Sequence, residues 1–256
     1  MDYYYEIDLS AALCFFKIKI NDVELLSMNV EGQTRIDIPI NSLILESGPQ
    51  EIEVIATPLN GQKELNKEAY IRYRVNVFDV SSGDYKFIKR FDEYYTPSVQ
   101  KGIPITAHKS KFEATVPYKL QAWQNGINLK DVKFDVKKEL IKKYNQIIQK
   151  IKNGDYEAFI KEYSKKEFNN ATSMYLSSEE AAARMKDIIE DMQNGFKVQD
   201  LPEDVFIEYS AYGKVVSLKC SDFMSALRLE NMDTGEELIL QITFYIPEGK
   251  DEFEVI

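Results

Sequence analysis

The spacing of apolar residues changes twice along this chain of 256 residues, and these changes restrict its fold class. In residues 1–128 apolar and polar residues alternate, which is typical of strands with one buried face. In residues 136–192 apolar residues recur every three or four positions, as on the buried side of a helix. Alternation returns from Val205 onward. The pattern predicts an α+β protein in which strands are followed by helices and then by further strands.

The alternating runs of the first half are separated by turn residues. Asn21-Asp22 predicts a tight turn between two of the runs. Six or more strands at this spacing predict an antiparallel β-sandwich over residues 1–128, of the immunoglobulin or jelly-roll kind. The main runs are residues 3–9, 14–20, 36–40, 69–77 and 112–122.

The second half predicts an α+β domain over residues 129–256. Helices are expected over residues 136–151 and 156–163, and a third helical stretch over 168–175. Ser177 and Glu180 form a capping box that opens a further helix, which Gly195 ends. The alternating runs after Val205 predict an antiparallel meander against which these helices pack.

The beginning of this domain resembles a known superfamily. The stretch Leu140–Ile148, the break at Asn153-Gly154-Asp155 and the stretch Tyr156–Phe159 resemble the opening of a nuclear-transport-factor-like (SnoaL-like) domain. The resemblance covers residues 132–256 and implies a cone built from helices and a curved antiparallel sheet. Some members of that superfamily use the cone pocket for catalysis and many do not.

The charge balance restricts the class of partner. The net charge is −10, which disfavours a nucleic acid or an anionic membrane surface. Residues 176–256 carry 7 Lys and Arg against 18 Asp and Glu, so the last third is the acidic part. This acidity is either a solvated surface or a face that steers a basic partner. No run of about 18 apolar residues predicts a membrane span, and the absence of a signal-like start favours a cytoplasmic location.

Residue types that carry covalent or metal chemistry are scarce. Cys14 and Cys220 lie at apolar strand positions and are expected to be buried free thiols. His108 is the only histidine, so no zinc site and no cofactor are predicted. The acids around Asp233-Thr234-Gly235 lack the ligand spacing of a calcium loop and predict a hairpin turn.

No phosphate loop, nucleophile elbow, metalloprotease or kinase motif is present. An acidic chain with a sandwich, an α+β module and no catalytic signature resembles the immunity proteins of interbacterial toxin systems. That resemblance implies a non-enzymatic protein that binds and neutralises one cognate toxin, here a basic one. The candidate contact residues are Tyr94 and Tyr95, in the segment 91–97, and the helix acids Glu179, Glu180, Asp187, Glu190 and Asp191.

Two other functions are consistent with the sequence. A small-ligand-binding or enzymatic protein would use the cone pocket, with Tyr209 and Asp222 as the first residues to test. A carbohydrate-binding sandwich would present coplanar exposed aromatic side chains, for which Trp123 and the run Tyr3-Tyr4-Tyr5 are candidates.

Overall fold

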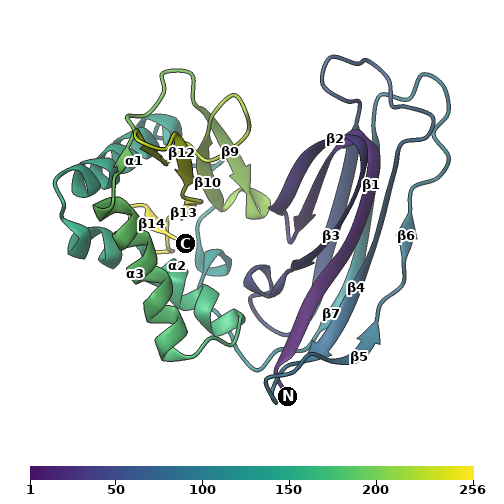
Figure 1. Ribbon diagram of the computed structural model, residues 1–256, viewed down its shortest axis with the longest axis horizontal. Helices are drawn as coiled ribbons and strands as arrows, with labels where there is room; N and C mark the ends of the chain where they lie inside the picture. The colour runs from purple at the N-terminus through teal and green to yellow at the C-terminus, as the bar shows by residue number, and fades with distance from the viewer. The chain divides into compact units, whose positions relative to one another are not determined.

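A computed structural model describes all residues from Met1 to Ile256. The protein belongs to the α+β class, as predicted, and the chain divides into two compact units, Met1–Leu120 and Gln121–Ile256 (Figure 1). No helix is both long and apolar enough to cross a membrane. Each unit is described separately below.

The first unit is one antiparallel sheet of seven strands, without helices longer than a single turn. Its two longest strands form a hairpin. The turn residues of this hairpin, Asn21 and Asp22, both have positive φ, as a type I′ turn requires. The strands are β1 (Tyr3–Ile20), β2 (Val23–Pro39), β3 (Gly48–Thr57), β4 (Tyr70–Asp79), β5 (Lys86–Arg90), β6 (Tyr94–Tyr95) and β7 (Thr106–Ala114).

The sheet curls on itself because β1 changes its partner along its length. Residues 3–12 of β1 pair with β4, and residues 15–20 pair with β3, on either side of an irregularity at Leu13 (φ 53°). The two layers of the predicted sandwich therefore belong to one curled sheet (Figure 1). The hydroxyl of Tyr5 hydrogen-bonds the backbone of Thr115, and that of Tyr73 lies 2.7 Å from Oγ of Ser110, so the layers meet across the core.

The second unit begins with three helices whose starts the sequence predicts. They are α1 (Val136–Lys152), α2 (Tyr156–Ser173) and α3 (Ser178–Gln193). The side chains of Asp135, Asp155 and Ser177 accept hydrogen bonds from the first turns of these helices, and Ser177 and Glu180 form the predicted capping box. The third helical stretch expected over residues 168–175 is the last part of α2, because no glycine or proline interrupts that helix.

The strands of the second unit form two small sheets instead of one meander. Buried side chains from α1, α2 and both sheets form one apolar core, in which Tyr144 and Phe244 are among the largest members. One sheet contains β9 (Phe206–Ser210), β10 (Val215–Lys219), β13 (Phe244–Tyr245) and β14 (Glu254–Val255). The other contains β8 (Phe196–Val198), β11 (Arg228–Asn231) and β12 (Glu236–Ile239).

The second unit includes residues 121–128, which the sequence pattern assigned to the first. Ile127 donates a backbone hydrogen bond to Ile246, and Glu248 donates one to Asn125. Gly126 also pairs with Pro247 in an isolated bridge. These contacts attach the segment to the strands of the second unit.

Candidate functional site

The outer face of the first unit has a cluster of three arginines at its centre. Alternation along β1 and β4 places Asp8 and Arg74 opposite each other, and Arg35 and Arg72 flank Ser10 one step further along. The cluster of Asp8, Arg35, Arg72, Arg74 and Glu93 is called the arginine centre below.

Asp8 holds the arginine centre together. Its side chain is 1% exposed, although it lies on the outer face, because the guanidinium groups cover it. Nη2 of Arg72 donates to Oδ1 at 2.7 Å, and Nε of Arg74 donates to Oδ2 at 2.8 Å. Nη2 of Arg35 adds a bond of 3.2 Å. Burial raises the pKa of Asp8, but the hydrogen bond from Arg74 and the three positive charges outweigh burial, so the pKa lies below its usual value.

A second carboxylate reaches the same arginines from outside. Nη1 of Arg72 donates to Oε1 of Glu93 at 2.6 Å, and Nη1 of Arg74 lies 3.9 Å from the same oxygen. The side chain of Glu93 is 46% exposed, in contrast to that of Asp8. Two guanidinium groups therefore converge on one exposed carboxylate.

The two tyrosines predicted to make contacts have different environments. Tyr95 is 58% exposed and stacks on Tyr70, with ring centroids 5.2 Å apart. Tyr94 is half-buried and stacks on His108 at 3.8 Å, beside Tyr73. Within the predicted contact segment 91–97, Glu93 and Tyr95 lie at the surface, whereas Tyr94 packs against Tyr73 and His108 on the inner side of the sheet.

A second group of aromatic side chains lies on the same outer face, next to β5, and Tyr4 is the only member that the sequence pattern singles out. Tyr85 and Phe87 are 61% and 51% exposed, and Phe78 contacts both rings edge to face. Tyr4 packs edge to face against Tyr85 and is almost covered. The residues Tyr4, Phe78, Tyr85 and Phe87 are called the aromatic patch below. Its sequence signal is weak because β5 is short and exposed on every residue.

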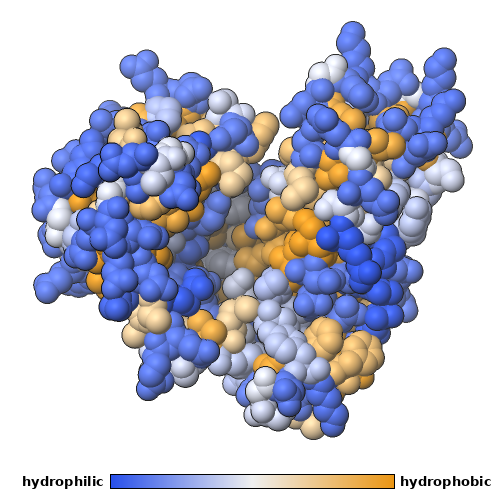
Figure 2. Space-filling model, viewed as in Figure 1, coloured by the Kyte–Doolittle hydropathy of each residue, from blue (hydrophilic) through white to orange (hydrophobic).

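The predicted acids of α3 lie on its solvent side. Glu179, Glu180, Asp187 and Glu190 are exposed, and Asp191 is half-buried. Glu180 caps the helix and Glu190 pairs with Lys186 at 2.9 Å. The surface over the helices of this unit is mostly hydrophilic in the view of Figure 2. These carboxylates form an acidic surface on α3.

The two predicted pocket residues have different environments. Tyr209 lies on β9, where the ammonium of Lys130 is 5.7 Å from its ring centre. Asp222 is exposed in a turn and accepts two bonds of 2.7 Å from Nη2 of Arg228, which keep its pKa below the usual value. Apolar side chains fill the interior between the helices and the strands.

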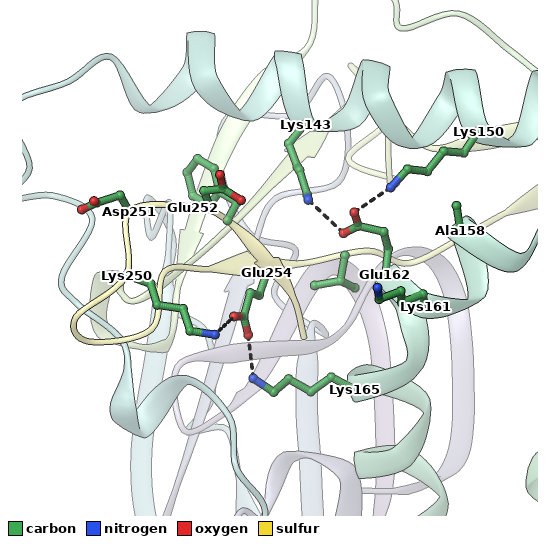
Figure 3. A pocket seen from close by; sticks show the side chains of 12 residues that line it. Lys143, Lys150, Ala158, Lys161, Glu162, Lys165, Lys250, Asp251, Glu252 and Glu254 are labelled. Carbon is green, nitrogen blue, oxygen red and sulfur yellow. Dashed lines mark hydrogen bonds and ion pairs between the residues drawn. The ribbon is translucent and has the colours of Figure 1, made fainter. Parts of the chain in front are cut away.

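The second unit has a surface groove of about 790 Å³ between α1, α2 and the segment 250–255 (Figure 3). Five lysines line it, and two glutamates each bridge a pair of them. Glu162 accepts from Lys143 at 2.8 Å and from Lys150 at 2.7 Å. The cavity lined by these residues is called the lysine groove below.

Glu254 forms the second bridge in the lysine groove. It accepts from Lys165 at 2.7 Å and from Lys250, and Lys165 also donates to the hydroxyl of Tyr245. Burial raises the pKa of Glu162 and of Glu254, but the lysines outweigh it and leave both pKa values below the usual range. Lys161 lines the same groove outside these bridges (Figure 3). Four carboxylates, those of Glu162, Asp251, Glu252 and Glu254, also line the groove, so its five lysines leave only a small excess of positive charge.

No cluster of three or more His, Cys, Asp and Glu side chains is arranged to hold a metal ion. Both cysteines are buried, and burial raises the pKa of Cys14 to about 11 and that of Cys220 above its usual value. A thiol with a raised pKa is a poor nucleophile at neutral pH.

Comparisons with protein-family models, curated protein sequences and solved structures found no match.

Proposed function

We propose that this chain is a non-enzymatic protein-binding protein and that its main contact surface is the outer sheet face of the first unit. The observation that carries the proposal is the combination of the arginine centre and the aromatic patch on one uncovered face. Aromatic residues and arginine are the residue types that dominate the energetics of protein interfaces. The outer face of a curled sheet with such side chains fits another folded protein better than it fits a small molecule.

The partner that we propose is a protein toxin with a basic surface, as the resemblance to immunity proteins implies. The acids of α3 support this choice because opposite charges accelerate association at low ionic strength. The aromatic patch would then supply the buried anchors that slow dissociation, since hot spots are centred on desolvated aromatic side chains.

The proposal can be tested by affinity capture from the native cell with the tagged full chain, at low and at high salt. We expect one stoichiometric protein partner with a basic surface. The double variant Tyr85→Ser/Phe87→Ser should lose this partner, whereas the control Phe168→Ser, which removes a 69% exposed aromatic side chain of α2, should retain it. Equal capture by all three proteins would exclude the sheet face as the contact surface.

The contribution of α3 has a separate test. The variant Asp187→Asn/Glu190→Gln should slow association with the captured partner at low salt and leave dissociation nearly unchanged. An association rate that does not depend on salt in the unmodified protein would show that the acidic helix has no steering role.

A second candidate function is the binding of a small anionic ligand in the lysine groove. Its volume is in the range of small-molecule sites, and five ammonium groups outnumber four carboxylates on its walls, with Lys161 outside the two glutamate bridges. A thermal-shift titration with citrate and with triphosphate tests this function, and Lys161→Ala should abolish any stabilisation. Carbohydrate binding is less well supported, because the rings of the aromatic patch meet edge to face and Tyr70 covers one face of Tyr95.

A further inference from the structure

We propose that the arginine centre is a carboxylate-binding site and that Glu93 is its internal occupant, which a carboxylate of the partner replaces. The inference builds on the proposed function, since it names the chemical group that the partner presents to the sheet face. It is carried by the geometry of Arg72 and Arg74, which Asp8 holds from below and Glu93 contacts from above.

The two arginines are fixed before any partner arrives. The carboxylate of Asp8 contacts Nη2 of Arg72 and both Nε and Nη2 of Arg74, at distances between 2.6 and 2.8 Å. This leaves Nη1 of each arginine directed at the position of Glu93 Oε1, at 2.6 and 3.9 Å. Guanidinium groups whose rotamers are already fixed lose little entropy when they bind an anion, and their fork geometry matches a carboxylate.

Glu93 differs from Asp8 in how easily it can leave. Asp8 is enclosed within β1, whereas Glu93 belongs to the short connection between β5 and β6 and has a half-exposed side chain. Exposed ion pairs contribute little to stability, because water and salt compensate the separated charges. Glu93 can therefore turn into solvent while the backbone around it stays anchored by the hydrogen bonds of Phe91 and Thr96 to β4.

The surroundings favour a carboxylate that belongs to a protein. Once Glu93 turns away, three guanidinium groups face one remaining carboxylate, so the centre attracts an anion. The stacked rings of Tyr70 and Tyr95 lie beside Arg72 and offer an apolar wall to the rest of the partner. Two other acids of this face, Glu6 and Asp37, lie beside Asp8 on β1 and β2, whereas Glu93 approaches the arginines from the opposite side of β4. We therefore assign the site to an Asp or Glu side chain, or to the terminal carboxylate, of a partner protein.

The test is a calorimetric titration of the full chain at low salt with a hexaglutamate peptide blocked at both ends. We expect Glu93→Gln to bind this peptide about tenfold more tightly than the unmodified protein, because a neutral amide competes less well for the arginines. Glu113→Gln is the matched control, since it removes the same charge from the exposed side of β7 and should leave the affinity unchanged. A blocked hexaglutamine peptide should not bind to any of the three proteins.

Further arms of the titration separate the possible sources of the anion. A peptide with a free terminal carboxylate and no acidic side chain distinguishes a chain terminus from an Asp or Glu side chain. Inorganic phosphate that binds Glu93→Gln more tightly than either peptide would overturn the assignment to a protein carboxylate. The arginine side-chain NMR signals of Glu93→Gln provide a second measurement, and those of Arg72 and Arg74 should shift on peptide addition.

The proposal is overturned if Glu93→Gln and Glu113→Gln bind the peptide equally well or if neither binds it. That result leaves the proposed function intact as long as Tyr85→Ser/Phe87→Ser still loses the captured partner. Conversely, if that double variant keeps the partner while Glu93→Gln gains affinity for hexaglutamate, the carboxylate site stands and the broader assignment of the sheet face fails.

Discussion

At the scale of single residues, Asp8 is the side chain on which the outer face depends most. Replacing it by Asn leaves Arg72 and Arg74 close together without their shared negative charge. Breaking a buried ion pair is costly, but water can solvate these arginines in part and so reduces the cost. We therefore expect Asp8→Asn to lower the free energy of unfolding by about 2–4 kcal/mol. Urea unfolding measures this change. Asp37→Asn, which alters the exposed cross-strand neighbour of Asp8, should change stability by less than about 0.5 kcal/mol.

The lowered pKa of Asp8 gives the same interaction a defined pH dependence. A carboxylate whose pKa is lower in the folded state stabilises the fold fully above its unfolded pKa, about 4, and loses this contribution as the pH falls through the folded value. The difference in stability between the unmodified protein and Asp8→Asn should therefore be constant near neutral pH and shrink below about pH 4. A difference that stays the same down to pH 2.5 would show that the charge of Asp8 is not what stabilises the face.

The sequence could predict which face of a strand a residue occupies, but not which residues meet. Alternation places Tyr5 and Tyr73 inside and Arg72 and Arg74 outside, as the structure has them. The arginine centre arises only when β2 and β4 pair with β1 in their particular registers. Register depends on contacts between residues far apart in the chain, such as Asp8 and Arg74, which are 66 positions apart. The alternating pattern of a single chain does not specify such pairs.

At the scale of elements, Tyr144 attaches α1 to the strands of the second unit. Its buried hydroxyl accepts a bond of 3.0 Å from the backbone N–H of Leu218 and lies 3.3 Å from the carbonyl of Ile242. We expect Tyr144→Phe to destabilise the protein by about 1–3 kcal/mol, because the N–H of Leu218 stays buried and loses its acceptor. Hydrogen exchange should show faster opening at Leu218. The control Tyr156→Phe, on the half-exposed side of α2, should have little effect on either measurement.

Helix starts were easier to predict than strand ends, for a local reason. A cap such as Ser177 with Glu180 lies within four residues, so the sequence contains the whole signal. The alternation over residues 112–122 predicts one long strand, yet β7 ends at Ala114. Its partner β3 begins at Gly48, opposite Ala114, and the N–H groups of Thr115 and Val116 donate to the side chains of Tyr5 and Ser47, so the ladder ends despite the alternating pattern.

At the scale of the whole molecule, the change of apolar period identifies the fold class, because strands and helices bury apolar residues at different spacings along the chain. The same change places the end of the first unit too late in the chain. The alternation ends at Ala122, and residues 121–128 belong to the second unit through backbone bonds of Asn125 and Ile127 to the strand region around Pro247. A segment attached by its backbone leaves little trace in the side-chain pattern.

This difference in boundary leads to a prediction for separate fragments. Each unit has its own apolar core, so residues 1–120 and residues 121–256 should each fold and unfold cooperatively. A fragment that starts at Leu129 lacks the bonds of Asn125 and Ile127 and the bond of 2.9 Å from Lys214 Nζ to the carbonyl of Gln124. At about 1 kcal/mol for each hydrogen bond, residues 129–256 should be about 2–4 kcal/mol less stable than residues 121–256 in urea.

Residues 1–120 and 1–128 should unfold at the same urea concentration, since the added segment belongs to the other unit. A fragment 129–256 as stable as 121–256 would place the boundary where the apolar period changes, and a more stable 1–128 would assign the segment to the sheet.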